Sequence, residues 1–427
     1  MKADAAAHDS YDALERRAPA AREAALIAEL PRIVARAQSA SPAFADILRG
    51  VEARTVCSRS ALAALPVTRK HELLARQQAA RAAGGDALGG FSAVGWRSLV
   101  RTGAARRVFQ SPGPIYEAEG QAVDSWRMAR ALFAAGMRAG DLLHNSFSYH
   151  LTPAGAIMES AAHALGCTVF AGGVGQTELQ LQAIADLRPD GYCGTPSFLK
   201  ILLDQAAEDA RPLSLRRALV SGEACPPSLQ ARFRAQGVEA LQCYASADVG
   251  LIAYETSAHE GLVLDEGVIV EIVRPGSGEP VPEGDVGEVV VTVLDHQNPL
   301  LRFGTGDLSA WLAGPCPSGR TAPRIKGWLG RADQTTKVRG MFVHPAQVAD
   351  AMRRHPEVLR ARLVVGGTPG SDTLTLRVEV DAVPDGLAER LGESLRRTTQ
   401  LRCEVELLAP GSLPSDGKTI EDARHHA

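Results

Sequence analysis

The chain has 427 residues, of which 45% are hydrophobic and 22% charged, with a formal net charge of −3. This balance indicates a folded protein of two or three domains and gives no reason to expect a nucleic acid as partner. We find no apolar run long enough to cross a bilayer and no secretory pattern at the N-terminus, so no membrane partner and a cytoplasmic location are expected.

The cysteines are spread along the chain, and no two stand at the spacing of a metal-binding knuckle. Their number, seven, is odd. Reduced thiols are therefore expected, with a zinc site built from distant Cys and His residues as the alternative.

Residues 1–90 have a helical pattern. Leu26, Leu30, Ile33 and Val34 recur at helical spacing and predict one apolar stripe. Residues 122–189 then alternate between helix and strand patterns, which predicts parallel sheets with helices packed on their faces. The expected elements are a helix at 122–135, a strand at 141–147, a helix at 154–165, a strand at 167–170, and a helix that opens with Thr177 as N-cap and ends near Pro189.

The last part of the chain is richer in strand patterns. Residues 268–273 and 288–294 flank the turn cluster Pro275–Pro280 and predict an antiparallel piece that ends the large domain. Beyond Arg331, an alternating strand at 373–380, a helix at 387–398 and a strand near Val405 predict a smaller domain. The fold class expected is α/β, with a large, multi-lobed N-terminal domain of mixed and parallel sheets (1–330) and a small C-terminal α/β domain (331–427).

Four landmarks follow in a fixed order: Leu301–Leu308 (LRFGTGDL), Gly330–Asp333 (GRAD), Val338–Pro345 (VRGMFVHP) and Gly417–Lys418. Together they resemble the adenylate-forming enzymes, the superfamily of acyl-CoA synthetases. They resemble most closely the branch of the phenylacetate-CoA ligases. Two segments earlier in the chain, Gly172–Glu178 and Cys193–Ser197, also resemble this branch. The resemblance covers about residues 100–427 and implies that the C-terminal domain is a mobile lid.

The resemblance implies roles for four residues near the junction and the C-terminus. Asp307 would accept hydrogen bonds from both ribose hydroxyls, and Arg331 would donate to the ribose and the adenylate. Asp333 would be the hinge of the lid. Lys418 would be the catalytic lysine that bridges the substrate carboxylate and the α-phosphate. The alternatives are a turn aspartate, a surface arginine, an ordinary linker and a solvated tail lysine.

Other nucleotide contacts are implied in the middle of the chain. Ser221, Gly222 and Glu223 lie in the segment along which the adenine would pass, since a backbone of small residues lets a flat ring approach closely. Tyr244 would lie against the adenine, and Asp248 would take the place of the family's Mg²⁺-binding glutamate. The alternative for this region is a buried strand end.

Three residues are implied in acyl binding. Ala245 stands where the family has glycine and would narrow the groove beneath the acyl group. Tyr149 and His150 lie in a segment that borders the acyl pocket and would line it for an acid with a flat or apolar body. The alternative for His150 is a core histidine.

The family's phosphate-binding loop has a counterpart, Phe109–Glu117, that departs from the pattern. It contains no lysine, keeps one hydroxyl at Ser111 and a phenol at Tyr116, and places Glu117 where phosphates are expected. Pro112 and Pro114 each remove a backbone donor. Since each charge-assisted hydrogen bond contributes about 1.5–3 kcal/mol, losing several would weaken ATP binding by orders of magnitude.

The sequence is therefore compatible with two alternative functions. The first is ATP-dependent activation of a carboxylic acid, with an aryl acid expected, as acyl-AMP, and transfer to coenzyme A or another nucleophile, with ATP/AMP, Mg²⁺ and coenzyme A as the ligands. In this case residues elsewhere in the chain would take over the loop's role. The second is a divergent member that has lost adenylation and acts in acyl transfer, amide formation or ligand binding. The expected partner is a small-molecule carboxylic acid, and a homodimer is left open because members of this branch are often dimers.

Overall fold

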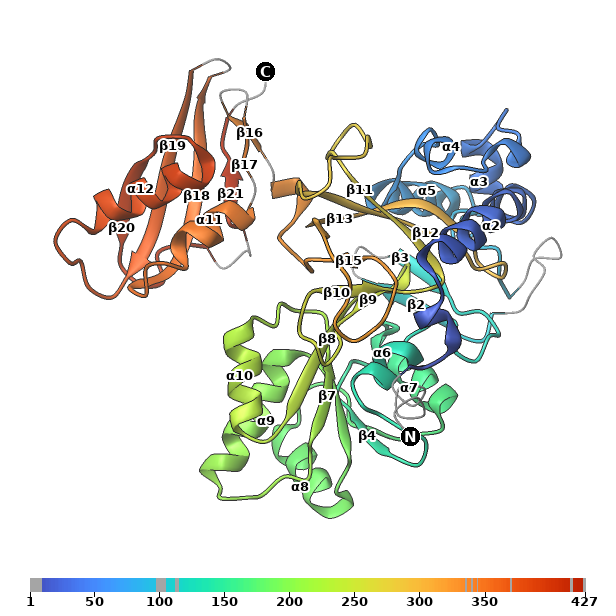
Figure 1. The fold of residues 1–427 in the computed structure, drawn as a ribbon, viewed down its shortest axis with the longest axis horizontal. Coiled ribbons are helices and arrows are strands. Elements are labelled where there is room, and N and C mark those ends of the chain that lie inside the picture. Colours follow the sequence, from blue (N-terminus) through green and yellow to red (C-terminus); the bar gives the residue numbers. More distant parts are fainter. Residues whose placement is uncertain are drawn as a thin grey trace. The chain divides into compact units, whose positions relative to one another are not determined.

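The computed structural model describes residues 10–96, 105–111, 115–334, 336–338, 341–343, 345–368, 371–414 and 418–424. These form two compact units. The larger comprises Met1–Arg274, Gly278–Thr305 and Ala310–Gly327, and the smaller comprises Pro275–Ser277, Gly306–Ser309 and Trp328–Ala427. Figure 1 shows several sheets in the larger unit and a sheet with helices in the smaller one. The predicted α/β class, with a large domain of several sheets and a small C-terminal α/β domain, is confirmed.

Helices from the first 90 residues cover a four-stranded sheet whose order is β1-β13-β12-β11. The predicted apolar stripe is confirmed, because Leu26, Leu30, Ile33 and Val34 are buried in α2 and share a core with Ile269 of the sheet. The elements are η1 Ala13–Arg16, α2 Pro19–Ala40, α3 Pro42–Ile47, η2 Ala53–Thr55, α4 Arg59–Ala63, β1 Thr68–Arg69, α5 Lys70–Ala82, β11 Val268–Val273, β12 Gly287–Val293 and β13 Leu300–Ser309. The antiparallel pairing of β11 with β12 was predicted and is confirmed.

A nine-stranded sheet follows, in the order β14-β15-β10-β9-β8-β7-β6-β4-β5. Strands β5, β4, β6, β7 and β8 are parallel, as predicted, and the rest of the sheet is antiparallel. The strands are β4 Leu142–Asn145, β5 Thr168–Ala171, β6 Gly191–Gly194, β7 Arg217–Val220, β8 Glu239–Ser246, β9 Gly250–Tyr254, β10 Leu262–Leu264, β14 Trp311–Leu312 and β15 Arg324–Ile325. The helices are α6 Ala129–Ala134, α7 Ala154–Leu165, α8 Thr177–Leu187, α9 Pro196–Glu208 and α10 Pro227–Ala235, and a separate hairpin pairs β2 Val108–Ser111 with β3 Ile115–Ala118.

Two local predictions were wrong. The helix expected from residue 122 begins at Ala129, because the Asp124 carboxylate accepts hydrogen bonds from the backbone N–H groups of Met128 and Ala129 and holds the preceding residues in a turn. Thr177 is the first residue of α8 rather than its N-cap. The N-cap is Gln176, whose backbone is left-handed and whose side chain makes no cap hydrogen bond.

The smaller unit is built on a four-stranded sheet of order β20-β19-β18-β21, with β16 and β17 forming a separate pair. Its core includes Leu391 and Leu395 of α12 and Leu376 and Val378 of β19, which face one another as the alternation predicted. The elements are η3 Ala332–Gln334, β16 Thr336–Val338, β17 Met341–Val343, α11 Pro345–Met352, β18 Val358–Thr368, β19 Ser371–Val380, α12 Leu387–Thr399, β20 Glu404–Leu408 and β21 Ile420–Asp422.

Within the described part of the chain, no helix has the length and apolar character needed to span a membrane. The cysteines are free thiols. Among the same residues, no three His, Cys, Asp or Glu side chains stand close enough together to hold a metal ion.

Candidate functional site

The site residues expected in the larger unit follow the carboxyl ends of neighbouring parallel strands. Tyr149 and His150 follow β4, Ser221–Glu223 follow β7, and Asp248 follows β8. Ligands of open α/β sheets bind at this edge, because the loops that leave adjacent strands surround one crevice there. The sheet topology therefore brings these predicted residues to one edge.

The loop after β7 lies against β8. The Ser221 hydroxyl donates to the carbonyl oxygen of Cys243 at 2.8 Å, which places the loop beside Tyr244. Gly222 has a φ of +81° and is exposed, and an added Cβ would meet no atom closer than 3.9 Å. Glu223 accepts a hydrogen bond from the Ser197 hydroxyl at 2.9 Å, so its carboxylate joins this loop to the start of α9.

Strand β8 is irregular at the residues that were expected to contact the ligand. Its pairing with β9 shifts register between Tyr244 and Ala245, and both side chains are half-buried. A bulge of this kind changes the direction in which the following side chains point, and such bulges are common next to binding sites. The alternative expected a buried strand end, and at these two residues the end of β8 is half-buried.

The loop after β4 is stabilised by hydrogen bonds from Asn145, the last residue of that strand. The amide of Asn145 donates to the Tyr149 hydroxyl at 2.8 Å and to the Gly155 carbonyl at 2.9 Å. The Tyr149 side chain is exposed at the surface, and partial burial of its phenol raises the pKa of that group. His150 is exposed, so the alternative of a core histidine is wrong.

The segment expected to replace the phosphate loop is the β2–β3 hairpin, with residues 112–114, including Pro112 and Pro114, outside the described part of the chain. Ser111 is buried, and its hydroxyl donates to Glu117 Oε2 at 2.9 Å. Arg107 upstream is paired with Glu119. The hairpin therefore presents the Glu117 carboxylate together with the Ser111 hydroxyl.

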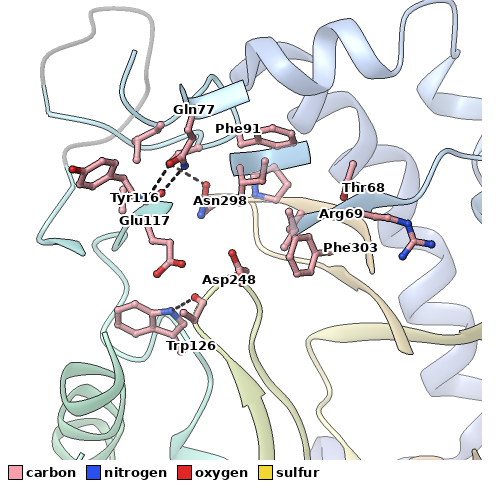
Figure 2. A pocket seen from close by; sticks show the side chains of 17 residues that line it. Thr68, Arg69, Gln77, Phe91, Tyr116, Glu117, Trp126, Asp248, Asn298 and Phe303 are labelled. Atoms are coloured by element: carbon pink, nitrogen blue, oxygen red, sulfur yellow. Dashed lines mark hydrogen bonds between the residues drawn. The ribbon is translucent and has the colours of Figure 1, made fainter. Parts of the chain in front are cut away.

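Glu117 faces Asp248 across a cavity (Figure 2). Lys70, the first residue of α5, donates to Asp248 Oδ2 at 3.0 Å, and the Asp248 side chain is only 5% exposed. Burial, together with the nearby Asp248 carboxylate, raises the pKa of Glu117 to about 7. Asp248 Oδ1 and Glu117 Oε1 are buried and have no hydrogen-bond partner in the described structure.

The cavity has a volume of about 90 Å³. Trp126 and Phe303 bound it on two sides in Figure 2, and Asn298 and Phe91 lie above the two carboxylates. The Trp126 indole donates to the Ala247 carbonyl at 3.3 Å, which fixes the ring beside the loop that carries Asp248. Acidic oxygens therefore point into a space that is also lined by aromatic rings, by the amides of Gln77 and Asn298 and by the Arg69 side chain.

In the smaller unit, Asp307 and Arg331 are in contact. Arg331 Nη1 lies 3.0 Å from Asp307 Oδ1, and the two residues also form an isolated antiparallel bridge. The Trp328 indole donates to the same Asp307 oxygen at 3.1 Å. Gly306 makes room for this pair, because it has a φ of +73° and an added Cβ would lie 2.6 Å from Arg331 Nη2.

The segments that carry the other two predicted residues of the smaller unit, Asp333 and Lys418, are joined by a hydrogen bond between their neighbours. Asp333 is in η3, and Lys418 is exposed. Thr419, which follows Lys418, donates its backbone N–H to the Gln334 side chain at 2.9 Å, and Gln334 follows Asp333. Of the motifs quoted from the sequence, Arg339, Gly340, His344 and Gly417 lie outside the described residues.

Neither the pairing of Lys70 nor a role for Arg302 was predicted from the sequence. Lys70 lies outside the region that resembles the family, and its only local signal is the helix start at Thr68–Glu72. Arg302, inside the LRFGTGDL landmark, is 2% exposed and pairs with Glu271 at 2.9 Å. Its guanidinium also donates to the carbonyls of Ala63, Leu65 and Gly278, so this arginine links separate segments of the larger unit.

Residues 126–293 match the model of a family described as AMP-binding enzyme. The phenylacetate-coenzyme A ligase of Thermus thermophilus is 32% identical over 317 residues, which cover 67% of this chain and 71% of that protein. The phenylacetate-coenzyme A ligase of Pseudomonas putida is 29% identical, with 77% and 79% covered.

One solved structure, an open conformation of 2-hydroxyisobutyryl-CoA ligase in complex with 2-HIB-AMP and CoA, is similar over 96% of this chain and 93% of that one. Its TM-score is 0.79, at 23% sequence identity. This similarity is one of fold.

Proposed function

This chain belongs to the AMP-binding, adenylate-forming family that includes the acid-CoA ligases, and we propose that it activates an aryl carboxylic acid. The acid would react with ATP to give acyl-AMP and pyrophosphate. The acyl group would then pass to coenzyme A or to another nucleophile, with release of AMP.

The observation that carries this proposal is the contact between Asp307 and Arg331. The two residues are 24 positions apart, yet the fold joins them at 3.0 Å. A carboxylate can accept from two neighbouring hydroxyls and a guanidinium can donate to oxygen atoms beside it, which suits a ribose and its phosphate. Asp307 would accept from the ribose hydroxyls, and Arg331 would donate to the ribose and the α-phosphate.

The larger unit supports an adenine site at the end of β7 and β8. Ser221–Glu223 would border the ring, and Tyr244 would lie on it. Tyr149, His150 and Ala245 would line the acyl group, because they lie at the same edge of the sheet. Ser111 would contribute a hydroxyl to the phosphates.

The residues present fit a magnesium ion as one carboxylate ligand among phosphate and water ligands. Asp248 offers a buried oxygen, Oδ1, that has no partner in the described structure. When bound, the ion would neutralise phosphate charge. Lys70 lies beside Asp248 and would supply the cation that the Phe109–Glu117 segment does not provide.

The smaller unit would act as the lid. We place its boundary at Arg331, with residues 1–330 as the nucleotide and acyl domain and 331–427 as the lid, and with Asp333 as the hinge. Lys418 would bring its ammonium to the substrate carboxylate and the α-phosphate, where negative charge accumulates during adenylation. The hydrogen bond from Thr419 to Gln334 supports this role, because it ties the lysine segment to the hinge segment.

One observation favours a second function. Glu117 puts a second carboxylate beside Asp248, where a triphosphate needs positive charge. This favours a divergent member that has lost ATP-dependent adenylation and retains acyl transfer, amide formation or ligand binding.

ATP–pyrophosphate exchange across a panel of aryl acids tests the two functions. Exchange with the wild-type chain that is lost in Lys418→Ala supports adenylation. The absence of exchange with every acid, combined with measurable binding of AMP or acyl-CoA, supports the divergent member. Binding of none of these ligands would overturn both.

A further inference from the structure

The segment that carries Lys418 connects the two edges of the sheet in the smaller unit. Strand β20, which ends at Leu408, lies at one edge beside β19. Strand β21, which begins at Ile420, lies at the other edge beside β18. Residues 409–419 join these two edge strands, and we call them the lysine crossover. Its described residues are 409–414 and 418–419.

The described start of the lysine crossover lies on the sheet face opposite helix α12. Leu363 of β18 and Val378 of β19 point toward that helix and share its apolar core (Figure 1). Because side chains alternate along a strand, Arg360 and Arg362 of β18 point to the opposite face. Glu379 is the cross-strand partner of Arg360 and therefore points to this face as well.

These three side chains hold the lysine crossover by its backbone. Arg360 donates to the carbonyl oxygen of Leu413 at 3.1 Å and to that of Pro414 at 2.7 Å. Arg362 donates to the same Pro414 carbonyl at 3.3 Å, and Glu379 accepts a hydrogen bond from the backbone N–H of Leu413. Leu413 and Pro414 are therefore fixed against β18 and β19.

The chain is fixed again directly after the lysine. Thr419 donates its backbone N–H to Gln334 Oε1 at 2.9 Å, and its carbonyl accepts from the Leu363 N–H at 2.9 Å. Lys418 therefore lies between two anchored points, while its own side chain is exposed. A short stretch of chain between two anchors has few conformations, so the anchors restrict where the Lys418 ammonium can lie.

The anchoring groups are charged although they are buried. Arg362 is 3% exposed and Glu379 is 2% exposed. Burying charges costs desolvation free energy, and apolar contacts of similar volume often stabilise a fold equally well. Charged hydrogen bonds fix a backbone segment more narrowly, because each has a preferred length and direction. The arrangement therefore favours a role in placing the segment over a role in stability alone.

We propose that Arg360, Arg362 and Glu379 are positioning residues that fix the place of the Lys418 ammonium for adenylation. The inference rests on the proposed function and deepens it, because it identifies what orients the catalytic lysine. A charge that is already in place stabilises the transition state without reorganisation. The anchors should therefore raise kcat and leave the binding of nucleotide at Asp307 and Arg331 unchanged.

Arg360→Gln tests the catalytic consequence, because it removes both donors of a side chain that is 40% exposed. The kcat of ATP–pyrophosphate exchange should fall about tenfold or more, with the KM for ATP and the Kd for AMP within about twofold of the wild type. Arg360→Lys keeps one cationic donor and should recover part of kcat.

Arg377→Gln is the matched control. Arg377 is the cross-strand partner of Arg362, so it lies on the same face of the sheet. Its side chain is 45% exposed and pairs with Glu406 of β20 at 2.8 Å rather than with the lysine crossover. This variant should leave kcat, KM and Kd unchanged.

Digestion of the full chain by a lysine-specific protease measures the anchoring independently of catalysis. Cleavage after Lys418, followed by mass spectrometry of the C-terminal peptide, should be about tenfold or more faster in Arg360→Gln than in the wild type or Arg377→Gln, because proteolysis follows local release of the segment. Circular dichroism identifies a variant that fails to fold. If Arg360→Gln does so, Arg360→Lys decides both assays.

An unchanged rate of cleavage, or faster cleavage with an unchanged kcat, would overturn the positioning role. Equal losses of kcat and of AMP affinity would also overturn it, because they would show a structural effect on the whole unit. A wild-type chain without exchange rejects the proposed function and the positioning role together. Exchange by the wild type that Arg360→Gln leaves intact rejects the positioning role alone.

Discussion

Arg331 Nη1 lies 3.0 Å from Asp307 Oδ1, and Gly306, beside the aspartate, leaves the space that the guanidinium fills. Both residues also pair through their backbones as an isolated bridge. The pair is therefore positioned by local chain geometry as well as by charge. A carboxylate and a guanidinium held in this way are suited to accept from and donate to one sugar phosphate.

Gly306→Ala should weaken AMP binding about tenfold or more. The residue has a φ of +73°, and the added Cβ would lie 2.6 Å from Arg331 Nη2, so the guanidinium must move. Losing one charge-assisted hydrogen bond accounts for this magnitude. Isothermal titration calorimetry with AMP measures it. Gly314→Ala is the matched control, because Gly314 has a φ of +85° and open space around its Cα. Similar losses in both variants would show that the pair does not hold AMP.

Lys70→Ala should reduce ATP–pyrophosphate exchange by at least about tenfold, since it removes the cation that pairs with Asp248 beside the expected phosphates. Lys200→Ala is the control. Both lysine side chains are 43% exposed and pair with an aspartate, at 3.0 Å for Lys70 and 2.7 Å for Lys200. Equal activity in the two variants would exclude Lys70 from nucleotide binding.

The stability of the chain should fall as the pH rises through the range set by Glu117. An unfolded glutamate loses its proton near 4.5, whereas folded Glu117 has a pKa of about 7. Between these values the folded chain binds more protons, so its free energy of unfolding decreases with increasing pH and levels off above about 7. The difference corresponds to at most on the order of 3 kcal/mol.

Urea denaturation of the wild type and of Glu117→Gln at pH 5 and pH 8 measures this effect. The stability advantage of Glu117→Gln over the wild type should be larger at pH 8 than at pH 5, because the amide cannot ionise. A pH-independent difference between the two proteins would contradict the assignment.

Ala245→Gly should shift the preferred acid toward larger acyl groups. Ala245 is half-buried just beyond the bulge of β8, and removing its methyl group opens the space beneath the acyl group. One buried methylene contributes about 0.8 kcal/mol, so we expect about a fourfold change in the ratio of kcat/KM between acids that differ by one carbon. Steady-state kinetics with a homologous series of aryl acids provides the measurement. An unchanged ratio would place the acyl group elsewhere.

Much of the fold followed from local patterns in the sequence. The stripe of α2, helix α7 and the β11–β12 pair were expected, because apolar periodicity and turn residues are local properties. The start of α6 was not, because the Asp124 side chain caps two backbone donors and competes with the helix. The N-cap of α8 was also misplaced, since a left-handed Gln176 leaves no sequence signal.

The site could be predicted only where the chain carries a motif that resembles those of the family. Asp307 and Arg331 were expected from their landmarks, and the fold brings them into contact. The residues that surround Glu117 could not be predicted from the sequence. Lys70 and Asp248 are 178 positions apart, so their pairing depends on how α5 and β8 are placed in the larger unit. Charge in a local segment says little about which distant charges will face it.

Binding of a nonhydrolysable acyl-sulfamoyl adenosine, made with benzoic or phenylacetic acid, tests the central claim most directly. The wild-type chain should bind it saturably, and Asp307→Asn should weaken binding about tenfold or more, because the amide loses the negative charge offered to the ribose hydroxyls. Arg353→Gln, which removes an exposed ion pair of the same unit, should have no effect. Failure of the wild type to bind, or equal binding by Asp307→Asn, would contradict the assignment of this chain as an adenylate-binding enzyme.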